Sequence, residues 1–534
     1  MTTVAEPSEA AAGSHLASAP DTPRRRPPPS WLNTVVLVAA VPLTRAPFMT
    51  QTLYAFDSAN YALAVSRFYN VAFHQPHPPG YPLYVAIARA FDVVLNDANR
   101  SLVVESIAWS TLAVGCTVVL GQRLFGRTAG LLAGVLLAFT VGFWGYGEVA
   151  YPYAALSGET AVLALLAHVA LGGRERAAVW LGAAWAFAAG VRWDAAVFCG
   201  ALWLWALWSV RWRQRLASIG LAAVCVVAWA VPMVLLSGGW ETYRAAISDY
   251  LRTWSPQSAF VVGAYVSGGE TQAGYNLSFL VNYLRQMLGV GLLLIPYLLG
   301  RRFGPSALAT DTRSRFLALW TLPPLVTYVL AHLGEPGYVL SLAPQAAILA
   351  ALAILDLGYE ASVLGQVLRA RGWRVPAALG PAVSLLLLAV ILGWNVQAFL
   401  RGVGPGRLPD LRAHDFTTSA QVAFVRTQPP ASTLVLAHDI LRQVQFYVPD
   451  QSVQLLYSEY VPDWERVRTR TDLPGGTTQV VILDSPVSVP PEDAPRLREV
   501  VLRETPFRVS AWVLDVRGAR AVEHGYRYAR VVPI

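Results

Sequence analysis

The feature that most constrains this chain is a series of apolar segments, each close to the roughly 20 residues that cross a bilayer as a helix. We predict such spans near 31–49, 101–121, 128–145, 153–171, 177–191, 195–210, 216–237, 277–300, 316–333, 339–356 and 376–397. Only 14% of the 534 residues are charged, against about 25% in soluble domains. The segments therefore predict a mainly α, polytopic membrane bundle of about 11 spans.

The distribution of arginine predicts the orientation of this bundle. The chain contains no lysine, which favours a GC-rich bacterial genome. Arginines are dense in every second loop: at Arg24–Arg26, Arg123 and Arg127, Arg174 and Arg176, Arg211, Arg213 and Arg215, Arg301 and Arg302, and Arg369, Arg371 and Arg374. Because cytoplasmic loops carry the excess of positive charge, these loops predict a cytoplasmic amino terminus and an outer-face carboxy terminus. The net charge of +8 follows from topology and does not point to nucleic acid.

Three regions follow from this topology. Residues 1–30 are rich in Ala, Ser and Pro and predict a disordered cytoplasmic segment. Residues 31–400 form the transmembrane domain, and residues 401–534 follow the linker GVGPGRLPD. In this last region the short runs STLVLAHD and TQVVILDSP are typical of strands, so it predicts a small extracytoplasmic α/β domain on a multi-pass cell-membrane protein.

The first outer loop contains the proline-rich stretch HQPHPPGYPLY at 74–84. Apolar spacing predicts one helix over 58–69, starting at Asp57, and a second over 82–94. Both are too short or too polar to span, so we expect them in the plane of the membrane interface. The prolines form a hinge between them that leaves few backbone N–H groups to satisfy.

Asp57 is the only acid between the first span and Asp92. A carboxylate at that depth, facing into the protein, can bind a metal ion or deprotonate an acceptor hydroxyl. It can equally cap the helix that follows, a role worth ~1 kcal/mol. The sequence alone leaves both interpretations open.

The order of these motifs resembles the GT-C superfamily of polyprenyl-phosphate-sugar glycosyltransferases, over roughly residues 31–400. The nearest branch is the protein O-mannosyltransferase-like group, with its DSGE…HPPGYPLY pattern. FWGYGEVAYPY at 143–153 resembles the second-loop motif of that group, and HLGEPGYVLSLAP at 332–344 resembles its later H…GYxLxxxP segment. The chain departs from the family where paired acids are usual, since Ser58 follows Asp57.

The resemblance implies an enzyme that transfers a mannose-like hexose or similar sugar, with inversion, from a polyprenyl-phosphate donor on the outer face. The acceptor is a protein, a lipid or a cell-wall glycan, and membrane lipids surround the bundle. It assigns catalysis, and a possible Mg²⁺ or Mn²⁺ ion, to Asp57 and Glu148. The motif at 332–344 resembles the segment that contacts the lipid-linked donor, so we expect Tyr338 at the donor and further substrate contacts from His77, Tyr81 and Tyr151. The leaving phosphate needs a cation or hydrogen-bond donor, and Arg192, at a predicted outer membrane boundary, and His332, at the outer end of a span, are the candidates.

Each assignment has a simpler alternative. Arg192 is close enough in sequence to pair with Asp194, and His77 can hydrogen-bond a neighbouring loop. At the level of function, the alternative is a transporter or flippase for a lipid-linked substrate. Such proteins often show internal repeats and charges near the bilayer midplane. We find no repeat, and the notable acids lie at outer span ends, which favours the glycosyltransferase.

Overall fold

A computed structural model describes residues 30–254, 272–302, 310–330, 333–458, 463–484 and 487–533. The helices up to the end of the transmembrane region are α1 Ser30–Arg45, α2 Phe56–Ser66, α3 Pro82–Leu95, α4 Ala98–Phe125, α5 Arg127–Ala138, α6 Val141–Tyr146, α7 Tyr153–Leu171, α8 Glu175–Val191, α9 Trp193–Ser209, α10 Trp212–Leu236, α11 Trp240–Trp254, α12 Gln272–Leu288, α13 Ile295–Arg302, α15 Thr312–Leu330, α16 Ala343–Ala370 and α17 Leu379–Arg401. Short 3₁₀ turns occur at η1 Ala46–Phe48, η2 Val71–Phe73, η4 Val290–Leu294 and η5 Pro336–Leu342.

Six helices in the described ranges are long and apolar enough to cross a membrane. They lie at Trp31–Phe48, Ala98–Phe125, Tyr153–Leu171, Trp212–Leu236, Pro336–Ala370 and Leu379–Arg401. The pair Ala273–Leu288 and Val290–Arg302, bent by 113°, makes a seventh if it is one span. The chain is therefore a multi-pass membrane protein, while the count of about 11 spans and the outward orientation stay predictions.

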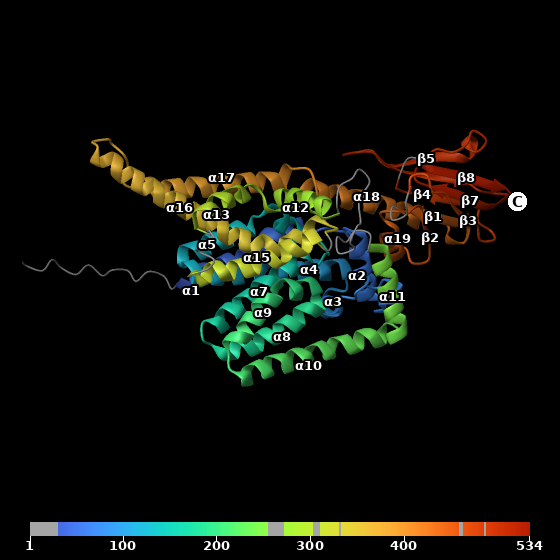
Figure 1. The fold of residues 1–534 in the computed structure, drawn as a ribbon. Coiled ribbons are helices and arrows are strands. Elements are labelled where there is room, and N and C mark those ends of the chain that lie inside the picture. The colour runs from blue at the N-terminus through green and yellow to red at the C-terminus, as the bar shows by residue number, and fades with distance from the viewer. Residues whose placement is uncertain are drawn as a thin grey trace, which may run out of the picture.

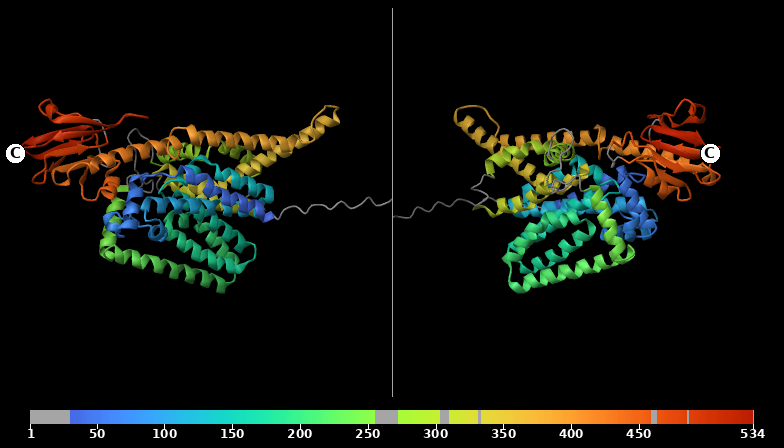
Figure 2. Two further views of the ribbon diagram at one scale, coloured as in Figure 1. Left: turned by 180° about the vertical axis from the view of Figure 1, so that it is seen from behind. Right: turned by 45° about the vertical axis from the view of Figure 1, so that its right-hand side comes forward.

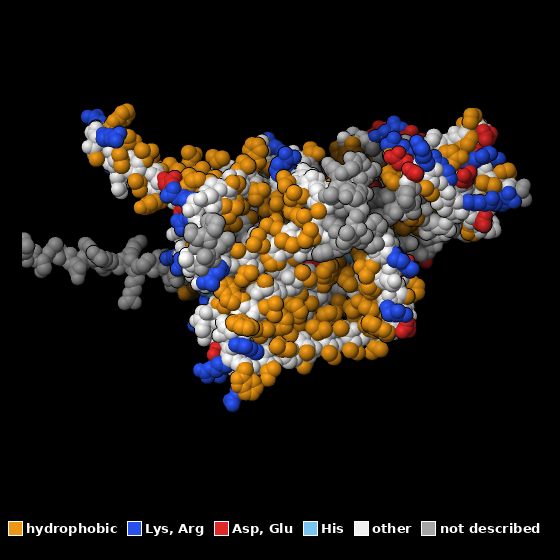
Figure 3. Space-filling model, in the orientation of Figure 1, with side chains coloured by type: hydrophobic (Ala, Val, Ile, Leu, Met, Phe, Trp, Pro, Cys, Tyr) orange, Lys and Arg blue, Asp and Glu red, His pale blue; other side chains and the backbone are white. Residues whose placement is uncertain are grey.

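The helices form one elongated bundle, with the start of α1 and the strands at opposite ends (Figures 1 and 2). Inside it, α4 packs against α1, α3, α5 and α7, and Asp97 caps its start by accepting a hydrogen bond from the Arg100 N–H at 3.0 Å. Hydrophobic side chains cover much of the face in Figure 3, and the exposed large hydrophobic residues of the chain include Trp180, Leu204 and Val224. An apolar surface of this kind suits contact with lipid.

The carboxy-terminal region is the α/β domain that the sequence predicts. It contains α18 Leu408–Arg426, α19 Leu441–Tyr447, the 3₁₀ turns η6 Pro430–Ser432 and η7 Ala494–Arg496, and the strands β1 Thr433–Ala437, β2 Ser452–Leu455, β3 Thr469–Asp472, β4 Gln479–Ile482, β5 Leu497–Arg503, β6 Val509–Asp515, β7 Ala519–Gly525 and β8 Tyr528–Pro533. One sheet has the order β2-β1-β4-β6-β5, and a second has β3-β7-β8. The two predicted strand runs are β1 and β4, which pair in parallel at the centre of the larger sheet.

The first outer loop is more deeply covered than we expected. The first predicted helix is α2, which ends at Ser66, and its residues 58–65 are all buried. The predicted helix is thus confirmed with an earlier end and is enclosed by protein, while its position in the plane of the membrane interface stays a prediction. The reason for the burial is tertiary: α19 of the carboxy-terminal domain packs on one side of α2, while α3 and α4 pack on others.

Helix α18 fastens the chain just before α2. The Asp415 carboxylate accepts hydrogen bonds from the main-chain N–H groups of Gln51 and Thr52 at 3.0 and 2.8 Å, and from the Thr52 hydroxyl at 2.8 Å. Asp415 itself is only 8% exposed. A carboxylate that accepts several hydrogen bonds from main-chain donors holds that backbone in one conformation.

Two tyrosines add to this attachment. The Leu53 N–H donates to the hydroxyl of Tyr447 in α19 at 3.0 Å, and the Tyr54 hydroxyl donates to Asp410 in α18 at 2.8 Å. Residues 51–54 are therefore held by the carboxy-terminal domain immediately ahead of Asp57.

We predict that Asp415→Ala destabilises the protein by about 2 kcal/mol, because buried donors that lose their acceptor cost about 1–3 kcal/mol. The apparent unfolding temperature in detergent should fall, and protease should cut residues 49–54 sooner. Asp472→Ala is the control, since that side chain is 85% exposed and pairs only with exposed Arg470. Equal unfolding temperatures for the two variants would contradict the role of Asp415.

Candidate active site

Asp57 lies in the first turn of α2 and does not cap it. The residue before the helix is Ala55, whose N–H donates to the Ser58 hydroxyl at 3.1 Å, so the capping alternative for Asp57 is wrong. Its carboxylate instead accepts hydrogen bonds from the Tyr151 hydroxyl and the Asn60 amide, each at 3.2 Å. The side chain is 33% exposed, so a substrate hydroxyl can still reach it.

His77 faces Asp57 from the proline hinge. Its Nδ1 lies 3.3 Å from Oδ1 of Asp57, and its side chain is 10% exposed. Gly80 makes the hinge possible, because its φ is +128° and a Cβ there would lie 2.7 Å from the Tyr69 hydroxyl. Burial and the positive charge of Arg192 lower the pKa of His77, while the negative charge of Asp57 raises it. The net pKa is lowered, so the imidazole is neutral at pH 7.

Arg192 lies at the junction of α8 and α9 and is 3% exposed. Its Nε donates to Asp194 at 2.6 Å, so the predicted pairing with Asp194 is confirmed. Its guanidinium lies over the rings of Tyr153 and Tyr338, with 4.6 and 4.7 Å to their centroids. The two ring centroids are only 5.4 Å apart, so both rings contact the guanidinium from neighbouring directions and restrict its orientation. The pairing does not consume the whole guanidinium, since it uses only Nε among five N–H donors.

Tyr338 reaches Arg192 because the η5 turn packs closely on the start of α7. A Cβ on Gly337 would overlap the ring of Tyr153, so only glycine allows this approach. The Tyr338 main-chain carbonyl accepts a hydrogen bond from the Tyr328 hydroxyl at 2.6 Å. His332, predicted in the same motif, lies outside the described residues.

Tyrosine rings line the space between Asp57 and Arg192. Tyr81 and Tyr151 are both buried, and their rings contact Tyr61, with centroids 5.4 and 6.5 Å away. Tyr151 in turn packs edge-on against Tyr153 at 4.7 Å. The predicted residues Asp57, His77, Tyr81, Tyr151, Arg192 and Tyr338 are thus joined by a chain of contacts at one end of the bundle.

Glu148 is placed differently. Its side chain is fully buried, and burial raises its pKa to about 9, against the opposing charge of Arg45 and the side chain of Trp144. Its main-chain carbonyl accepts from the Thr50 N–H at 3.0 Å, which ties the second outer loop to the first. The carboxyl group faces the end of α1, whereas the carboxylate of Asp57 faces His77 and Tyr151. The catalytic role of Glu148 stays a prediction.

The predicted divalent cation lacks a full ligand set in the described ranges. No three His, Cys, Asp or Glu side chains gather there in a way that could hold a metal ion. Asp57 offers one carboxylate, and Glu148 is turned toward Arg45. The Mg²⁺ or Mn²⁺ ion therefore stays a prediction, and we assign no chemical step to it.

Some residues of the site were not predicted. Tyr61, at 1% exposure, contacts the rings of His77, Tyr81 and Tyr151, yet in the sequence it is one apolar position of a helix. Glu159 lies buried in α7, and neither carboxylate oxygen has a hydrogen-bond partner among the described residues. A carboxyl group inside a spanning segment costs free energy, so such a residue usually has a function. The position of Glu159 within an apolar segment could have been noticed in the sequence alone.

Comparison with known proteins agrees with the motif order. Residues 76–237 match the family described as dolichyl-phosphate-mannose-protein mannosyltransferase. The structure of ArnT from Cupriavidus metallidurans bound to undecaprenyl phosphate is similar, with 14% sequence identity, 91% of this chain and 98% of that chain covered, and a TM-score of 0.53.

A second similar structure is the apo oligosaccharyltransferase of Archaeoglobus fulgidus, 11% identical over 79% of this chain and 64% of that one, with a TM-score of 0.50. No curated protein sequence matches the chain. These findings support the resemblance found in the sequence: residues 76–237 match the mannosyltransferase family, and the chain shares its fold with these two membrane transferases.

Proposed function

We propose that this protein is a glycosyltransferase that moves a mannose-like hexose from a polyprenyl-phosphate donor to an acceptor hydroxyl on the extracytoplasmic face. The observation that carries the proposal is the partly exposed Asp57 carboxylate, joined through tyrosines to a buried, oriented Arg192. The similar ArnT structure holds undecaprenyl phosphate, which supports a polyprenyl phosphate as the donor lipid. Activated sugar transfer requires these two functions, a base and a cation for the leaving group.

The reaction runs between these two groups. Asp57 takes the proton of the acceptor hydroxyl, and the acceptor oxygen bonds to the anomeric carbon of the donor sugar with inversion. The bond between that carbon and the phosphate oxygen breaks, and the polyprenyl phosphate leaves with the electron pair. Arg192 stabilises the negative charge on the leaving phosphate, where a preorganised cation in a water-poor site is most effective.

Asp57 fits the role of general base better than Glu148 does. A carboxyl group whose pKa is about 9 is protonated at neutral pH and cannot accept the proton. Asp57 keeps one-third of its surface exposed and is held by the Tyr151 and Asn60 hydrogen bonds. His77 lies next to Asp57 and is neutral, so it does not form an ion pair that would occupy the carboxylate.

We predict that Asp57→Asn lowers the rate of sugar transfer from a polyprenyl-phosphate sugar by about 100- to 10,000-fold, the usual contribution of a general base. Glu148→Gln should lose less than about tenfold, because glutamine resembles the protonated acid. Asp472→Asn is the matched control and should leave the rate unchanged. If a folded Asp57→Asn variant still transfers the sugar at the wild-type rate, the assignment of Asp57 as general base is wrong. If the wild-type protein moves the lipid across the membrane without transferring a sugar, the flippase is favoured.

We also predict an acid limb in the pH–rate profile that depends on His77. Because the pKa of His77 is lowered, the ring takes a proton only below the ordinary value of about 6.5. The charged ring then pairs with Asp57 and withdraws the carboxylate from the acceptor, so the rate falls as the pH falls. His77→Gln cannot titrate, and its profile should stay flat to lower pH. An identical acid limb in both proteins would show that His77 does not govern it.

A further inference from the structure

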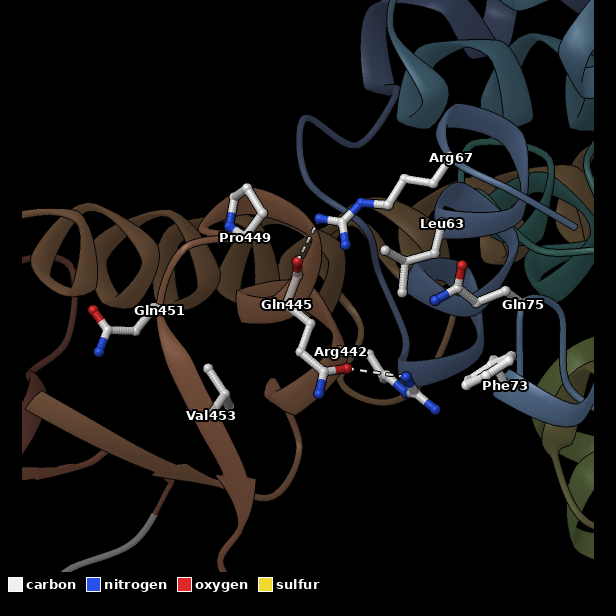
Figure 4. A pocket seen from close by; sticks show the side chains of 9 residues that line it. All are labelled: Leu63, Arg67, Phe73, Gln75, Arg442, Gln445, Pro449, Gln451 and Val453. Carbon is white, nitrogen blue, oxygen red and sulfur yellow. Dashed lines mark hydrogen bonds between the residues drawn. The ribbon is translucent and has the colours of Figure 1, made fainter. Parts of the chain in front are cut away.

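A polar cleft lies where the first outer loop meets the carboxy-terminal domain (Figure 4). Its volume is about 310 Å³. The polar side chains that line it are Arg67, Gln75, Arg442, Gln445 and Gln451. The lining residues include two arginines and no acid, so the described part of this cleft is electropositive.

Arg442 lines the cleft from α19 of the carboxy-terminal domain. Its guanidinium lies 5.7 Å from the ring centroid of Phe56, and one terminal nitrogen donates to the Gln445 side chain at 3.0 Å. Its Nε is buried and has no hydrogen-bond partner in the described ranges. A guanidinium that has lost water at one N–H gains most from an anionic acceptor.

The remaining polar groups add both donors and acceptors. Arg67 uses one terminal nitrogen on the Gln445 main-chain carbonyl at 2.9 Å, which directs its guanidinium across the cleft, as Figure 4 shows. The side-chain oxygens of Gln75 and Gln451 are buried without a partner within the described residues. Amide side chains in the same cleft as two guanidinium groups suit a molecule that carries both hydroxyl groups and negative charge.

The cleft lies beside α2, the helix that carries Asp57. Phe56, Leu63 and Arg67 lie on one face of this helix, because seven and four residues correspond to about two turns and one turn. Leu63 is six residues beyond Asp57, a distance of ~9 Å along the axis. Arg442 is also close enough to Asp57 to interact with its charge. Six residues also turn the helix to a different face, so Leu63 and Asp57 do not point the same way. The connection between the cleft and the carboxylate is Arg442, which lies over Phe56, the residue next to Asp57.

We propose that this cleft binds the acceptor, and that the acceptor is a saccharide carrying a phosphate or carboxylate group. The inference rests on the proposed function and adds the class of substrate. The anionic group lies against Arg442 and Arg67. A hydroxyl at the inner end gives its proton to Asp57 and becomes the glycosidic oxygen, while the donor phosphate leaves with the electron pair of its bond to the sugar.

The test uses full-length protein in lipid nanodiscs and three soluble probes of equal size: a phosphorylated disaccharide, a hexuronic-acid disaccharide and a neutral disaccharide. Affinities are measured by saturation-transfer NMR titration. At least one anionic probe should bind the wild type about tenfold more tightly than the neutral one, and the preferred anion distinguishes phosphate from carboxylate. Arg442→Gln and Arg67→Gln should each reduce that preference, and Arg442→Gln more strongly.

Arg498→Gln, on the exposed side of β5, is the matched control and should keep the full preference. Equal affinity for neutral and anionic probes would overturn the proposal. So would a preference that survives in both cleft variants, or one that Arg498→Gln lowers equally, since either shows unspecific attraction. A parallel titration of the wild type with undecaprenyl phosphate separates the two proposals: if that lipid fails to bind, the donor assignment fails and the cleft does not.

Discussion

The buried charge of Arg192 is the constraint on which the candidate site depends. A guanidinium at 3% exposure is stable only where partners replace its water, and here Asp194 and the rings of Tyr153 and Tyr338 do so. These partners come from the α8–α9 junction, the start of α7 and the η5 turn. Satisfying one cation therefore brings together three connections that lie far apart in the sequence, at the end of the bundle that also holds Asp57.

The second half of the site depends on the carboxy-terminal domain. Asp415 and Tyr447 hold the segment ahead of α2, and α19 packs directly on that helix. The domain thus fixes the position of Asp57 from outside, while Tyr151 fixes it from within the bundle. This arrangement explains why a domain with no evident catalytic motif of its own belongs to the machinery, and why its Arg442 lies beside the reaction centre.

The transmembrane segments and the grouping of the loops that carry the site could be predicted from the sequence, because apolar length, arginine placement and motif order are local signals. Apolar length and arginine placement predicted that loops near Asp57, Tyr151, Arg192 and Tyr338 share one face, and contacts between them bear this out at the level of the bundle. The full burial of α2 could not be predicted, since one of the helices that cover it, α19, lies almost 400 positions later. The orientation of Glu148 was equally hidden, because it depends on packing against the end of α1 and not on its motif.

The central claim is that a polyprenyl phosphate binds the candidate active site with its phosphate on Arg192 and its sugar-bearing side toward Asp57. A cryo-EM structure of the full-length protein with undecaprenyl phosphate tests this most directly. We expect a phosphate oxygen within hydrogen-bond distance of the Arg192 guanidinium, which contacts Tyr153 and Tyr338, with an open path from the phosphorus to the Asp57 carboxylate. Phosphate density elsewhere, with Arg192 still enclosed by its present partners, would contradict the account.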